Sequence, residues 1–250
     1  MNINKLGEEI CIIKDDPNNK NTAIYLYEGH QEEHKLVKFF EELTIEAGYF
    51  QVVPDKKKDR TSIYIAGQNG SGKSYWIYQY LQEFIKRFPT YKIFMFSSKN
   101  HDENLDKITK LKRVVIDDTF ITNPINYELL KESLCIFDDI DALSKKIKDA
   151  VYELRDRIFN NGRSYHIHII ATSHQLSGKE NMVPIREANI ITFFLKNYNK
   201  NMRYFLENYV GLELEQIKKL RKVKTRATTL IKTMPNVILQ ERNLYTFDSL

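Results

Sequence analysis

The chain has 250 residues, of which 42% are hydrophobic, and its formal net charge is +5. A chain of this length and composition can bury one sizeable α/β core with small additions, which excludes two large domains. Its two cysteines are too few for a disulfide framework, no apolar run reaches the roughly 18 to 20 residues that span a bilayer, and the N-terminus lacks the apolar core of a signal peptide, so we expect an intracellular protein.

The first 60 residues are predicted to form an N-terminal elaboration of short elements. Apolar and β-branched residues favour short strands at 9–13 and 23–27, and the pattern at 32–40 favours a helix. A short basic run, Lys56, Lys57, Lys58 and Arg60, ends this region. The sequence assigns the elaboration no function.

A strand, a glycine-rich loop and a helix are predicted in succession from residue 61. Residues 61–66 have a strand pattern, and residues 75–88 have a helix pattern. The loop between them matches G-x-x-x-x-G-K-[ST] without a mismatch and consists of Gly67, Gln68, Asn69, Gly70, Ser71, Gly72, Lys73 and Ser74. Glycines let backbone N–H groups turn inward around a phosphate, Lys73 can reach the β and γ phosphates, and Ser74 can bind Mg²⁺. The loop therefore predicts a site for ATP and Mg²⁺.

Strands are next expected at 91–96, 113–116 and 133–137. The last of these ends in two adjacent carboxylates, Asp138 and Asp139, as a buried parallel strand would end at its functional edge. This pattern is typical of a Walker B motif, in which Asp138 would hold Mg²⁺ with Ser74 and Asp139 would activate water as a general base. Asp141 is interpreted as the N-cap of a helix that begins at Ala142.

The predicted helix at 142–160 ends before Gly162, and Arg163 follows directly. If a strand follows Arg163, this arginine lies about 20 Å from its own nucleotide, because a strand rises about 3.3 Å per residue. An arginine in that position can complete the active site of a neighbouring subunit. Arg155 and Arg157, on the helix, are rival candidates, and a solvated surface arginine is the alternative for each.

The next strand, 166–171, ends in Thr172, Ser173, His174 and Gln175. Open α/β sheets bind ligands at the carboxyl ends of their strands, so a residue here, with Gln175 as our choice, could sense the γ-phosphate or the lytic water. A polar turn is the alternative. We expect this strand to lie in space between the strands that end in the loop and in Asp138. A further strand is expected at 190–195.

Together, the loop 67–74, residues 137–139, 161–165 and 169–174 resemble the genome-packaging ATPases of large nucleocytoplasmic DNA viruses and virophages, within the FtsK/HerA group. The resemblance implies a RecA-like P-loop NTPase core of the additional-strand class, with a mostly parallel sheet flanked by helices. It also implies ATP hydrolysis, a homo-oligomeric ring of five or six subunits, double-stranded DNA as substrate, a capsid or portal partner, and location in the viral factory in the cytoplasm or in the virion. Two departures are Ser164, where family members often have His, and Asp139, where relatives often have Glu.

The C-terminal extension, 196–250, is expected to pack on the ATPase core, 61–195, and it carries a strongly basic segment. That segment, residues 218–226, contains Lys218, Lys219, Arg221, Lys222, Lys224 and Arg226. Clustered cations of this kind bind DNA independently of its sequence, by releasing counterions from the phosphates. The alternative is a solvated helix end followed by a strand near Thr225.

Other functions share the same loop and remain open at this point. A P-loop nucleotide kinase would need the loop but neither the second carboxylate nor DNA. A non-hydrolysing nucleotide-gated switch would leave Asp139 idle. An FtsK/HerA-like helicase or translocase in DNA repair or transfer would share the whole mechanism and differ only in its biological task.

Overall fold

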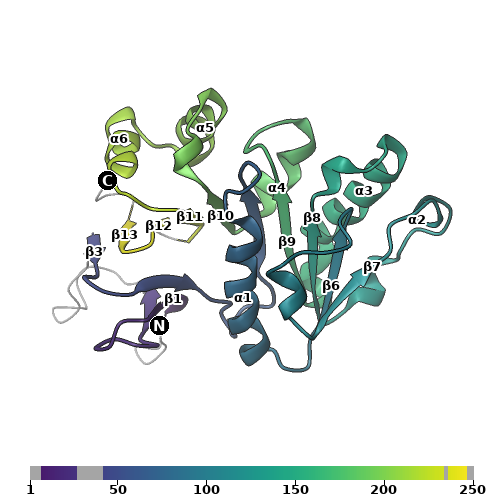
Figure 1. The fold of residues 1–250 in the computed structure, drawn as a ribbon, viewed down its shortest axis with the longest axis horizontal. Helices are drawn as coiled ribbons and strands as arrows, with labels where there is room; N and C mark the ends of the chain where they lie inside the picture. The colour runs from purple at the N-terminus through teal and green to yellow at the C-terminus, as the bar shows by residue number, and fades with distance from the viewer. Residues whose placement is uncertain (1–6, 27–41, 234–235, 247–250) are drawn as a thin grey trace.

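The computed structural model describes residues 7–26, 42–233 and 236–246, and these residues form two β-sheets and the helices that cover them (Figure 1). The strands are β1 (Glu8–Lys14), β2 (Ala23–Leu26), β3 (Glu42–Thr44), β4 (Tyr49–Val52), β5 (Ser62–Ala66), β6 (Lys92–Ser97), β7 (Leu111–Val114), β8 (Ser133–Asp138), β9 (Ile167–Ser173), β10 (Ile190–Phe193), β11 (Thr228–Ile231), β12 (Val237–Leu239) and β13 (Asn243–Thr246). The helices are α1 (Lys73–Arg87), α2 (Thr119–Thr122), α3 (Lys145–Asn161), α4 (Met182–Glu187), α5 (Lys200–Phe205) and α6 (Leu214–Lys222).

The larger sheet has the strand order β3-β13-β12-β11-β10-β5-β9-β8-β6-β7. Every pairing from β10 to β7 is parallel, and β11, β12, β13 and β3 continue the sheet in antiparallel pairs. The predicted mostly parallel sheet is confirmed. Strand β9 lies between β5 and β8, as the sequence predicts, so the three strands that end in candidate site residues are direct neighbours.

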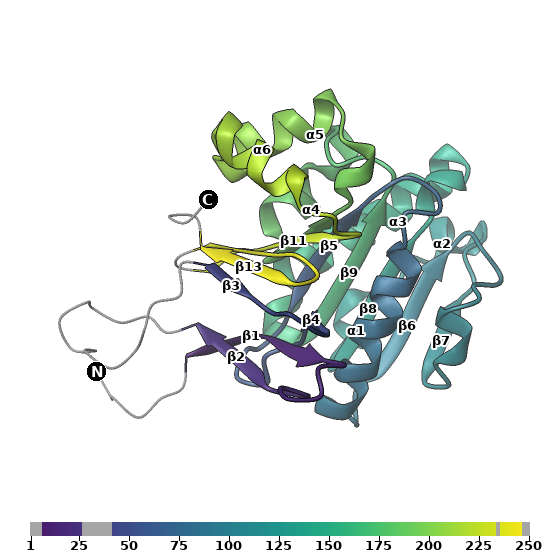
Figure 2. The same cartoon turned by 60° about the vertical axis from the view of Figure 1, so that its left-hand side comes forward.

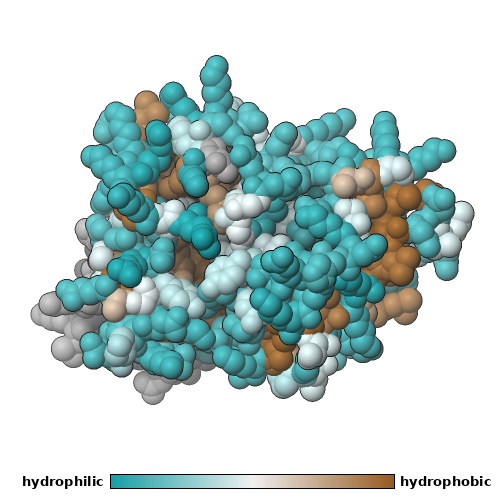
Figure 3. Space-filling view, in the orientation of Figure 1, coloured by the Kyte–Doolittle hydropathy of each residue, from teal (hydrophilic) through white to brown (hydrophobic). Residues whose placement is uncertain are grey.

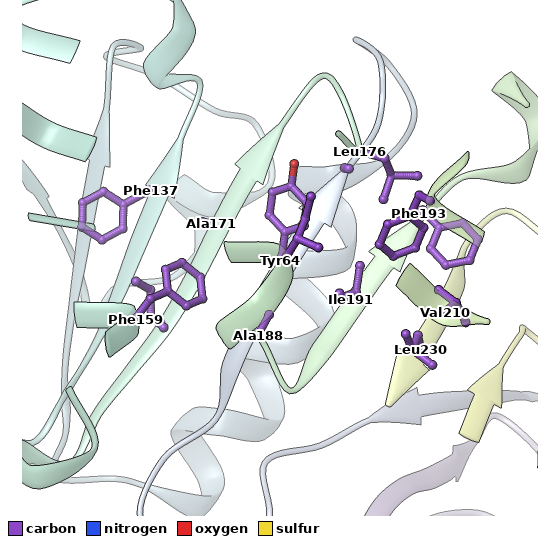
Figure 4. Packing of buried hydrophobic residues seen from close by; sticks show 14 of the residues in the cluster. Tyr64, Phe137, Phe159, Ala171, Leu176, Ala188, Ile191, Phe193, Val210 and Leu230 are labelled. Atoms are coloured by element: carbon purple, nitrogen blue, oxygen red, sulfur yellow. The ribbon is translucent and has the colours of Figure 1, made fainter. Parts of the chain in front are cut away.

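Successive residues of the central strands face opposite sides of the sheet, and both sides are buried. Ile63 and Ile65 pack with α1, while Tyr64 and Ala66 pack with α3 on the other side. Figure 2 shows α1 in front of β8 and β9 with α4 behind the sheet, and Figure 4 shows how Tyr64 and residues of neighbouring strands fill the second face. A parallel sheet covered on both faces explains the nearly continuous apolar runs in its strands.

A small sheet, β2-β1-β4, packs beside α1 and belongs to the N-terminal region. Two ion pairs connect it to the helix. The guanidinium of Arg87 donates to both carboxylate oxygens of Glu9 at 2.6 and 2.7 Å, and Lys14 pairs with Glu83 at 2.8 Å. The strands predicted at 9–13 and 23–27 correspond to β1 and β2, whereas the helix predicted at 32–40 lies outside the described residues.

The start of α3 corrects one prediction. Helix α3 begins at Lys145 with Ser144 as its N-cap, while Asp141 lies in a preceding 3₁₀ turn, Ile140–Ala142. Asp141 is therefore not the N-cap; it accepts a hydrogen bond from the Tyr152 hydroxyl at 2.6 Å. The helix begins later than predicted because Leu143 and Ser144 have extended backbones, with ψ angles of 157° and 150°.

Gly162 follows α3 as predicted, but its φ of −61° is right-handed. Glycine suits the close packing here, because a Cβ atom would lie 3.0 Å from Nη1 of Arg60 and 3.3 Å from the carbonyl oxygen of Ile167. That guanidinium donates to the carbonyl oxygens of Ile158 and Phe159, each at 2.6 Å, and so caps the end of α3. Arg60 thus has a structural role within the short basic run.

Both cysteines, Cys11 and Cys135, are free and buried. Within the described ranges, no helix is both long enough and apolar enough to cross a bilayer. Three exposed apolar side chains, Val115, Ile121 and Leu129, lie on or beside α2 and β7, where Figure 3 shows hydrophobic residues gathered on this face. The larger sheet contains β3 from the N-terminal region and β11, β12 and β13 from the C-terminal extension. The division of the chain at residues 60 and 195 stays a prediction.

Candidate nucleotide site

The glycine-rich loop 67–74 joins the end of β5 to the start of α1, at the carboxyl edge of the parallel strands. The amide of Gly67 donates to the carbonyl of Ser173 at 2.9 Å, which fixes the loop against the end of β9. Gly70 and Gly72 have φ angles of 72° and 109°, a region that other residues rarely adopt. Gly72 is the N-cap of α1, so the positive end of the helix dipole points into the loop. The geometry suits an anion.

Lys73 is buried, and its ammonium group lies inside the loop. It donates to the carbonyl oxygen of Gly67 at 2.8 Å and to that of Gln68 at 3.4 Å. Burial lowers the pKa of Lys73, and the carboxylate of Asp138 partly opposes this effect. A phosphate oxygen would give this ammonium a charged partner in place of two neutral carbonyls. Hydrogen bonds between charged groups are stronger, so an anionic ligand would stabilise the charged form of Lys73.

Asp138 is the last residue of β8 and is only 2% exposed. Its Oδ1 accepts a hydrogen bond from the Thr172 hydroxyl, at the end of β9, at 2.6 Å. Burial and the adjacent charge of Asp139 raise the pKa of Asp138. A buried carboxylate beside a second negative charge is stabilised by a cation, which a metal ion or Lys73 would supply.

Asp102, which the sequence analysis missed, lies beside Ser74. Burial raises the pKa of Asp102, but hydrogen bonds from the amide of Leu105 and the hydroxyl of Ser74 outweigh this effect and hold the pKa below its usual value. The backbone amides of Asn104 and Leu105 each donate to Asp102 at 3.0 Å. The only signal in the sequence was its place shortly after a predicted strand that ends at the same sheet edge.

These groups provide a donor set of the kind that Mg²⁺ prefers. Magnesium in phosphate-binding enzymes uses one or two carboxylates, a hydroxyl, water and substrate phosphates. Ser74 and Asp138 supply the hydroxyl and one carboxylate, and Asp102 is a second carboxylate next to Ser74. Among the described residues there is no group of three or more His, Cys, Asp or Glu side chains that could hold a metal. Any Mg²⁺ here would therefore depend on the phosphates for the rest of its ligands.

Asp139 is half-buried, with a cationic side chain at one carboxylate oxygen and an imidazole near the other. Lys99 forms an ion pair with its Oδ2, and Nε2 of His174 lies 3.5 Å from its Oδ1. The carbonyl of Asp139 accepts a hydrogen bond from the Ser98 hydroxyl at 2.6 Å, which holds the strained backbone in place. Lys99 follows β6 at the same sheet edge, but only the strand order brings it to Asp139.

The four sensor candidates, from Thr172 at the end of β9 to Gln175 beyond it, have different surroundings. Thr172 contacts Asp138, and His174 lies near Asp139. Ser173 is buried, and its hydroxyl accepts hydrogen bonds from Asn181 at 3.1 Å and from the amide of Gln175 at 3.2 Å, so it stabilises the turn. The side chain of Gln175 is exposed and lines a cavity of about 300 Å³ together with Gly67 and Gln68. Thr172 and His174 thus contact the candidate catalytic carboxylates more directly than Gln175 does.

The three arginine candidates are also distinguished by their environments. Arg163 is 76% exposed and pairs with the exposed Asp59 at 3.0 Å, at the end of β9 opposite to Thr172. Arg155 is 2% exposed and donates to the carbonyl of Glu180 at 2.6 Å, so it cannot reach another subunit. Arg157 is exposed and pairs with Glu153 on the same helix at 2.6 Å.

The basic segment 218–226 forms most of α6 and the turn that leads to β11. Five of its cations are exposed, namely Lys218, Arg221, Lys222, Lys224 and Arg226. Lys218 pairs with Glu215 at 2.6 Å, and Arg221 lies 4.1 Å from the ring of Tyr198. The segment therefore presents positive charge to solvent, and the strand expected near Thr225 begins at Thr228.

No protein-family model matches the chain. The chain is 36% identical over 217 residues to the uncharacterized protein V3 of Sputnik virophage, across 82% of this chain and 84% of V3. Its fold is similar to that of B204, the DNA-packaging ATPase from Sulfolobus turreted icosahedral virus, with a TM-score of 0.51 and 17% identity over 73% of this chain and 97% of B204. It is also similar to ATPases 2 and 3 of EssC from Geobacillus thermodenitrificans, with a TM-score of 0.51 and 16% identity over 82% of this chain and 43% of that chain. The predicted fold class is therefore confirmed.

Proposed function

The chain belongs to the same family as protein V3 of Sputnik virophage, and we propose that it is an ATP-hydrolysing motor subunit that drives viral double-stranded DNA into a capsid. The observation that carries the proposal is the convergence of three strand ends on one point. The glycine-rich loop after β5, Asp138 and Asp139 after β8, and Thr172 at the end of β9 all lie at the same edge of the sheet. This arrangement provides an anion site, a cation site and a candidate base side by side.

In the proposed mechanism, the backbone amides of 67–74 and the ammonium of Lys73 bind the β and γ phosphates. Ser74 and Asp138 would hold Mg²⁺, which would neutralise charge on the phosphates when bound. Asp139 accepts a proton from the attacking water, because its half-buried carboxylate stands free of the Thr172 hydrogen bond that occupies Asp138. Arg163 of a neighbouring subunit would complete the site, and the residues from Thr172 to Gln175 would transmit the loss of the γ-phosphate.

The proposal of DNA as substrate rests on a basic surface and on the relatives of the chain. The basic segment 218–226 suits the sequence-independent binding that a translocase needs. B204, which shares the fold, is a DNA-packaging ATPase. The family relationship to a virophage protein supports the proposal that the protein acts in a viral factory, with a capsid or portal component as partner. A ring of identical subunits would allow the DNA to pass through its centre.

The test is release of inorganic phosphate from ATP, with and without duplex DNA. We expect wild-type protein to hydrolyse ATP in the presence of Mg²⁺ and to do so faster with duplex DNA. Lys73→Ala should lower the rate by about 10²-fold or more, because it removes the charge that binds the phosphates. Lys92→Ala, at an exposed lysine of β6, is the matched control and should keep the wild-type rate.

Each other outcome has a defined meaning. If folded protein binds ATP but releases no phosphate, the motor proposal is wrong and a nucleotide-gated switch is favoured. Transfer of phosphate to an added nucleoside monophosphate would replace it with a kinase. If duplex DNA does not change the rate of hydrolysis, the proposed DNA translocation is contradicted while the proposed ATP hydrolysis is supported.

A further inference from the structure

Resting on the proposed function, which includes a ring of identical subunits, we propose that two surfaces of this chain bind each other in a head-to-tail contact between copies. The first, the acidic apolar surface, consists of Val115, Ile121, Glu128 and Leu129. The second, the basic cavity, has a volume of about 240 Å³, and its lining includes Ile185, Arg186, Ile191, Phe205, Leu230 and Lys232. Leu129 of one copy would enter the basic cavity of the next.

The 3₁₀ turn that carries Leu129, residues 127–130, is held in place by its neighbours. Leu130 is buried, and the ring of Tyr127 packs edge-on against that of Tyr165 with centroids 5.5 Å apart. The carboxylate of Glu128 accepts a hydrogen bond from the Tyr165 hydroxyl at 2.7 Å. Leu129 is nevertheless 80% exposed. Because the turn is already ordered, covering Leu129 with a partner would cost little further conformational entropy.

Leu129 belongs to a larger group of exposed apolar side chains. Val115 is 77% exposed, and Ile121 is also exposed. Figure 3 shows hydrophobic residues gathered on this face. Single exposed apolar side chains are common, whereas a group of them marks an interaction surface. The segment 115–130 also contains three carboxylates and no lysine or arginine, and only Lys131 follows it directly. The surface is therefore both apolar and negatively charged.

The basic cavity has an apolar floor that suits a leucine side chain. Its apolar residues come from α4, β10, α5 and β11, and four of them are almost fully buried, namely Ile185, Ile191, Phe205 and Leu230. Figure 4 shows Ile191 and Leu230 close together, as the pairing of β10 with β11 requires. A side chain that fills this floor would remove apolar surface from water on both partners.

The charge around the floor is positive. Among the described residues that line the cavity, Arg186 and Lys232 are cations and none is a carboxylate. Lys232 donates to the carbonyl oxygens of Ile185 at 2.7 Å and of Arg186 at 3.1 Å. An ammonium has three donors, so Lys232 keeps one for a carboxylate such as that of Glu128. Burial lowers the pKa of Lys232, and a carboxylate beside it would stabilise its charge.

Leu129 cannot reach the basic cavity of its own chain. The turn 127–130 leads into β8, and β9 and β5 lie between β8 and β10. Neighbouring strands are about 4.8 Å apart, so roughly 14 Å separate β8 from β10. In Figure 1, α3 and α4 lie between α2 and α5. Because two different surfaces of one chain form the contact, it is heterologous, and repetition of such a contact can close into a ring.

Sedimentation velocity at a series of protein concentrations, without nucleotide or DNA, measures the association of copies. We expect wild-type protein to form assemblies larger than a dimer. Leu129→Ser should raise the dissociation constant about tenfold or more, because it removes the apolar side chain at the centre of the contact. Leu214→Ser, at an exposed leucine of α6 outside both surfaces, is the matched control and should assemble as wild type does. Circular dichroism verifies that each variant is folded.

A mixture of two variants tests the head-to-tail arrangement. Arg186→Glu should also weaken association, because it places a carboxylate opposite Glu128. In an equimolar mixture, the acidic apolar surface of the Arg186→Glu chain still matches the intact cavity of the Leu129→Ser chain. The mixture should therefore form dimers that do not grow further, since each remaining surface is impaired. A mixture without dimers would contradict the pairing of these two surfaces.

Reversal of both charges on one chain tests the contact between Glu128 and Arg186. Glu128→Arg and Arg186→Glu should each weaken association when present alone. The chain that carries both substitutions should associate more tightly than either single variant, because the reversed charges attract again. If the double variant is as weak as the single variants, Glu128 does not meet Arg186.

The proposed contact and the proposed function fail in different ways. If wild-type protein stays monomeric at every concentration, or if Leu129→Ser assembles as wild type does, the contact is wrong, while ATP hydrolysis by the same preparation would still support the ATPase. If the copies assemble through these surfaces but release no phosphate from ATP, the contact stands and the motor is wrong.

Discussion

Asp138 and Asp139 are adjacent in sequence but differ in what holds them. Asp138 is buried and bonded to Thr172, whereas Asp139 is half-buried and has a left-handed backbone that turns its side chain towards Lys99 and His174. Two carboxylates with distinct partners can take distinct roles at one site. In this arrangement, Asp138 is suited to a metal ion and Asp139 to a proton.

We expect Asp139→Asn to lower the rate of ATP hydrolysis by about 10² to 10⁴-fold, because an amide cannot accept the proton of the attacking water. The affinity for ATP should change by less than about threefold, since Asp139 makes no contact with the glycine-rich loop. Phosphate release under single-turnover conditions and calorimetric titration with ATP measure the two quantities separately.

Lys99→Met is the matched control for that variant. It also breaks the ion pair with Asp139 but keeps the carboxylate, so its loss of rate should be much smaller. Equal losses in the two variants would show that the ion pair matters and that Asp139 is not the base.

His168 is a second residue whose environment sets its chemistry. It is fully buried among the rings of Phe84, Phe88 and Tyr91, and its Nδ1 accepts a hydrogen bond from the amide of Thr61 at 3.1 Å. Burial, with smaller effects from nearby positive charges, lowers the pKa of His168 to about 3. The neutral ring is therefore part of the core.

The folded protein should lose stability in acid through this residue. The unfolded chain protonates His168 near its ordinary pKa of 6.5, while the folded chain resists protonation until about pH 3. The free energy of unfolding is therefore intact above pH 6.5 and falls as the pH decreases from 6.5 towards 3, by up to about 1.4 kcal/mol per pH unit. Urea unfolding at a series of pH values measures the slope.

His168→Asn keeps an acceptor for Thr61 but cannot titrate. This variant should be less stable at pH 7, because it loses the ring contacts, and its stability should fall less steeply between pH 6 and 4. His166→Asn, at a half-buried residue with φ 52°, a conformation that Asn tolerates, should keep the wild-type slope. An unchanged slope in His168→Asn would contradict the assignment.

Among elements, α3 illustrates how neighbouring arginines on one helix can have opposite roles. Arg155 faces the sheet, stacks over the ring of Tyr152 at 4.0 Å and joins the helix to the turn that contains Glu180. Arg157, two residues later, faces solvent. Residues two apart lie on different faces of a helix, so one arginine cannot take over the contacts of the other.

Arg155→Met should lower the free energy of unfolding by about 3 to 5 kcal/mol, because Asp156 and the carbonyl of Glu180 would lose a buried partner. Arg157→Met should change it by less than about 1 kcal/mol, as is usual for exposed ion pairs. Urea unfolding of both variants gives the comparison. Similar stabilities would mean that Arg155 is not the internal link that its burial indicates.

The elements that could be predicted are those with local signals. The loop 67–74, the acidic end of β8 and the apolar runs of β5, β6, β8 and β9 all depend on residues close together in the chain, and their positions agree with the structure within about three residues. The start of α3 was missed because no local pattern distinguishes the extended backbone of Leu143 and Ser144 from a first helical turn.

At the scale of the whole molecule, the unpredicted contacts join distant parts of the chain. Strand β3 pairs with β13, which brings residues 42–44 beside residues 243–245. This pairing places β4 and the C-terminal strands on the same side of α1. Together these elements line a cavity of about 460 Å³. No local pattern predicts such a contact, because its strands are short and about two hundred residues apart.

The position of Arg163 leads to a prediction about the assembly. Arg163 and Thr172 lie at opposite ends of β9, a seven-residue strand, and are thus separated by roughly 20 Å. Its partner, Asp59, is 48% exposed, and an exposed ion pair is weak enough to be exchanged for a phosphate. If the subunits associate head to tail, Arg163 of one subunit can reach the loop of the next.

Mixing two inactive variants tests this arrangement. When assembled alone, Lys73→Ala should lose about 10²-fold or more of the hydrolysis rate, and Arg163→Ala about 10³-fold or more. In mixed assemblies, roughly a quarter of the interfaces would join an intact Lys73 to an intact Arg163 from the neighbour, so activity should return. If Arg163 served its own subunit, every site would still lack one residue and no activity would return. Arg157→Ala, active by itself, is the control, and intact assemblies without recovery would contradict the role of Arg163 across the subunit boundary.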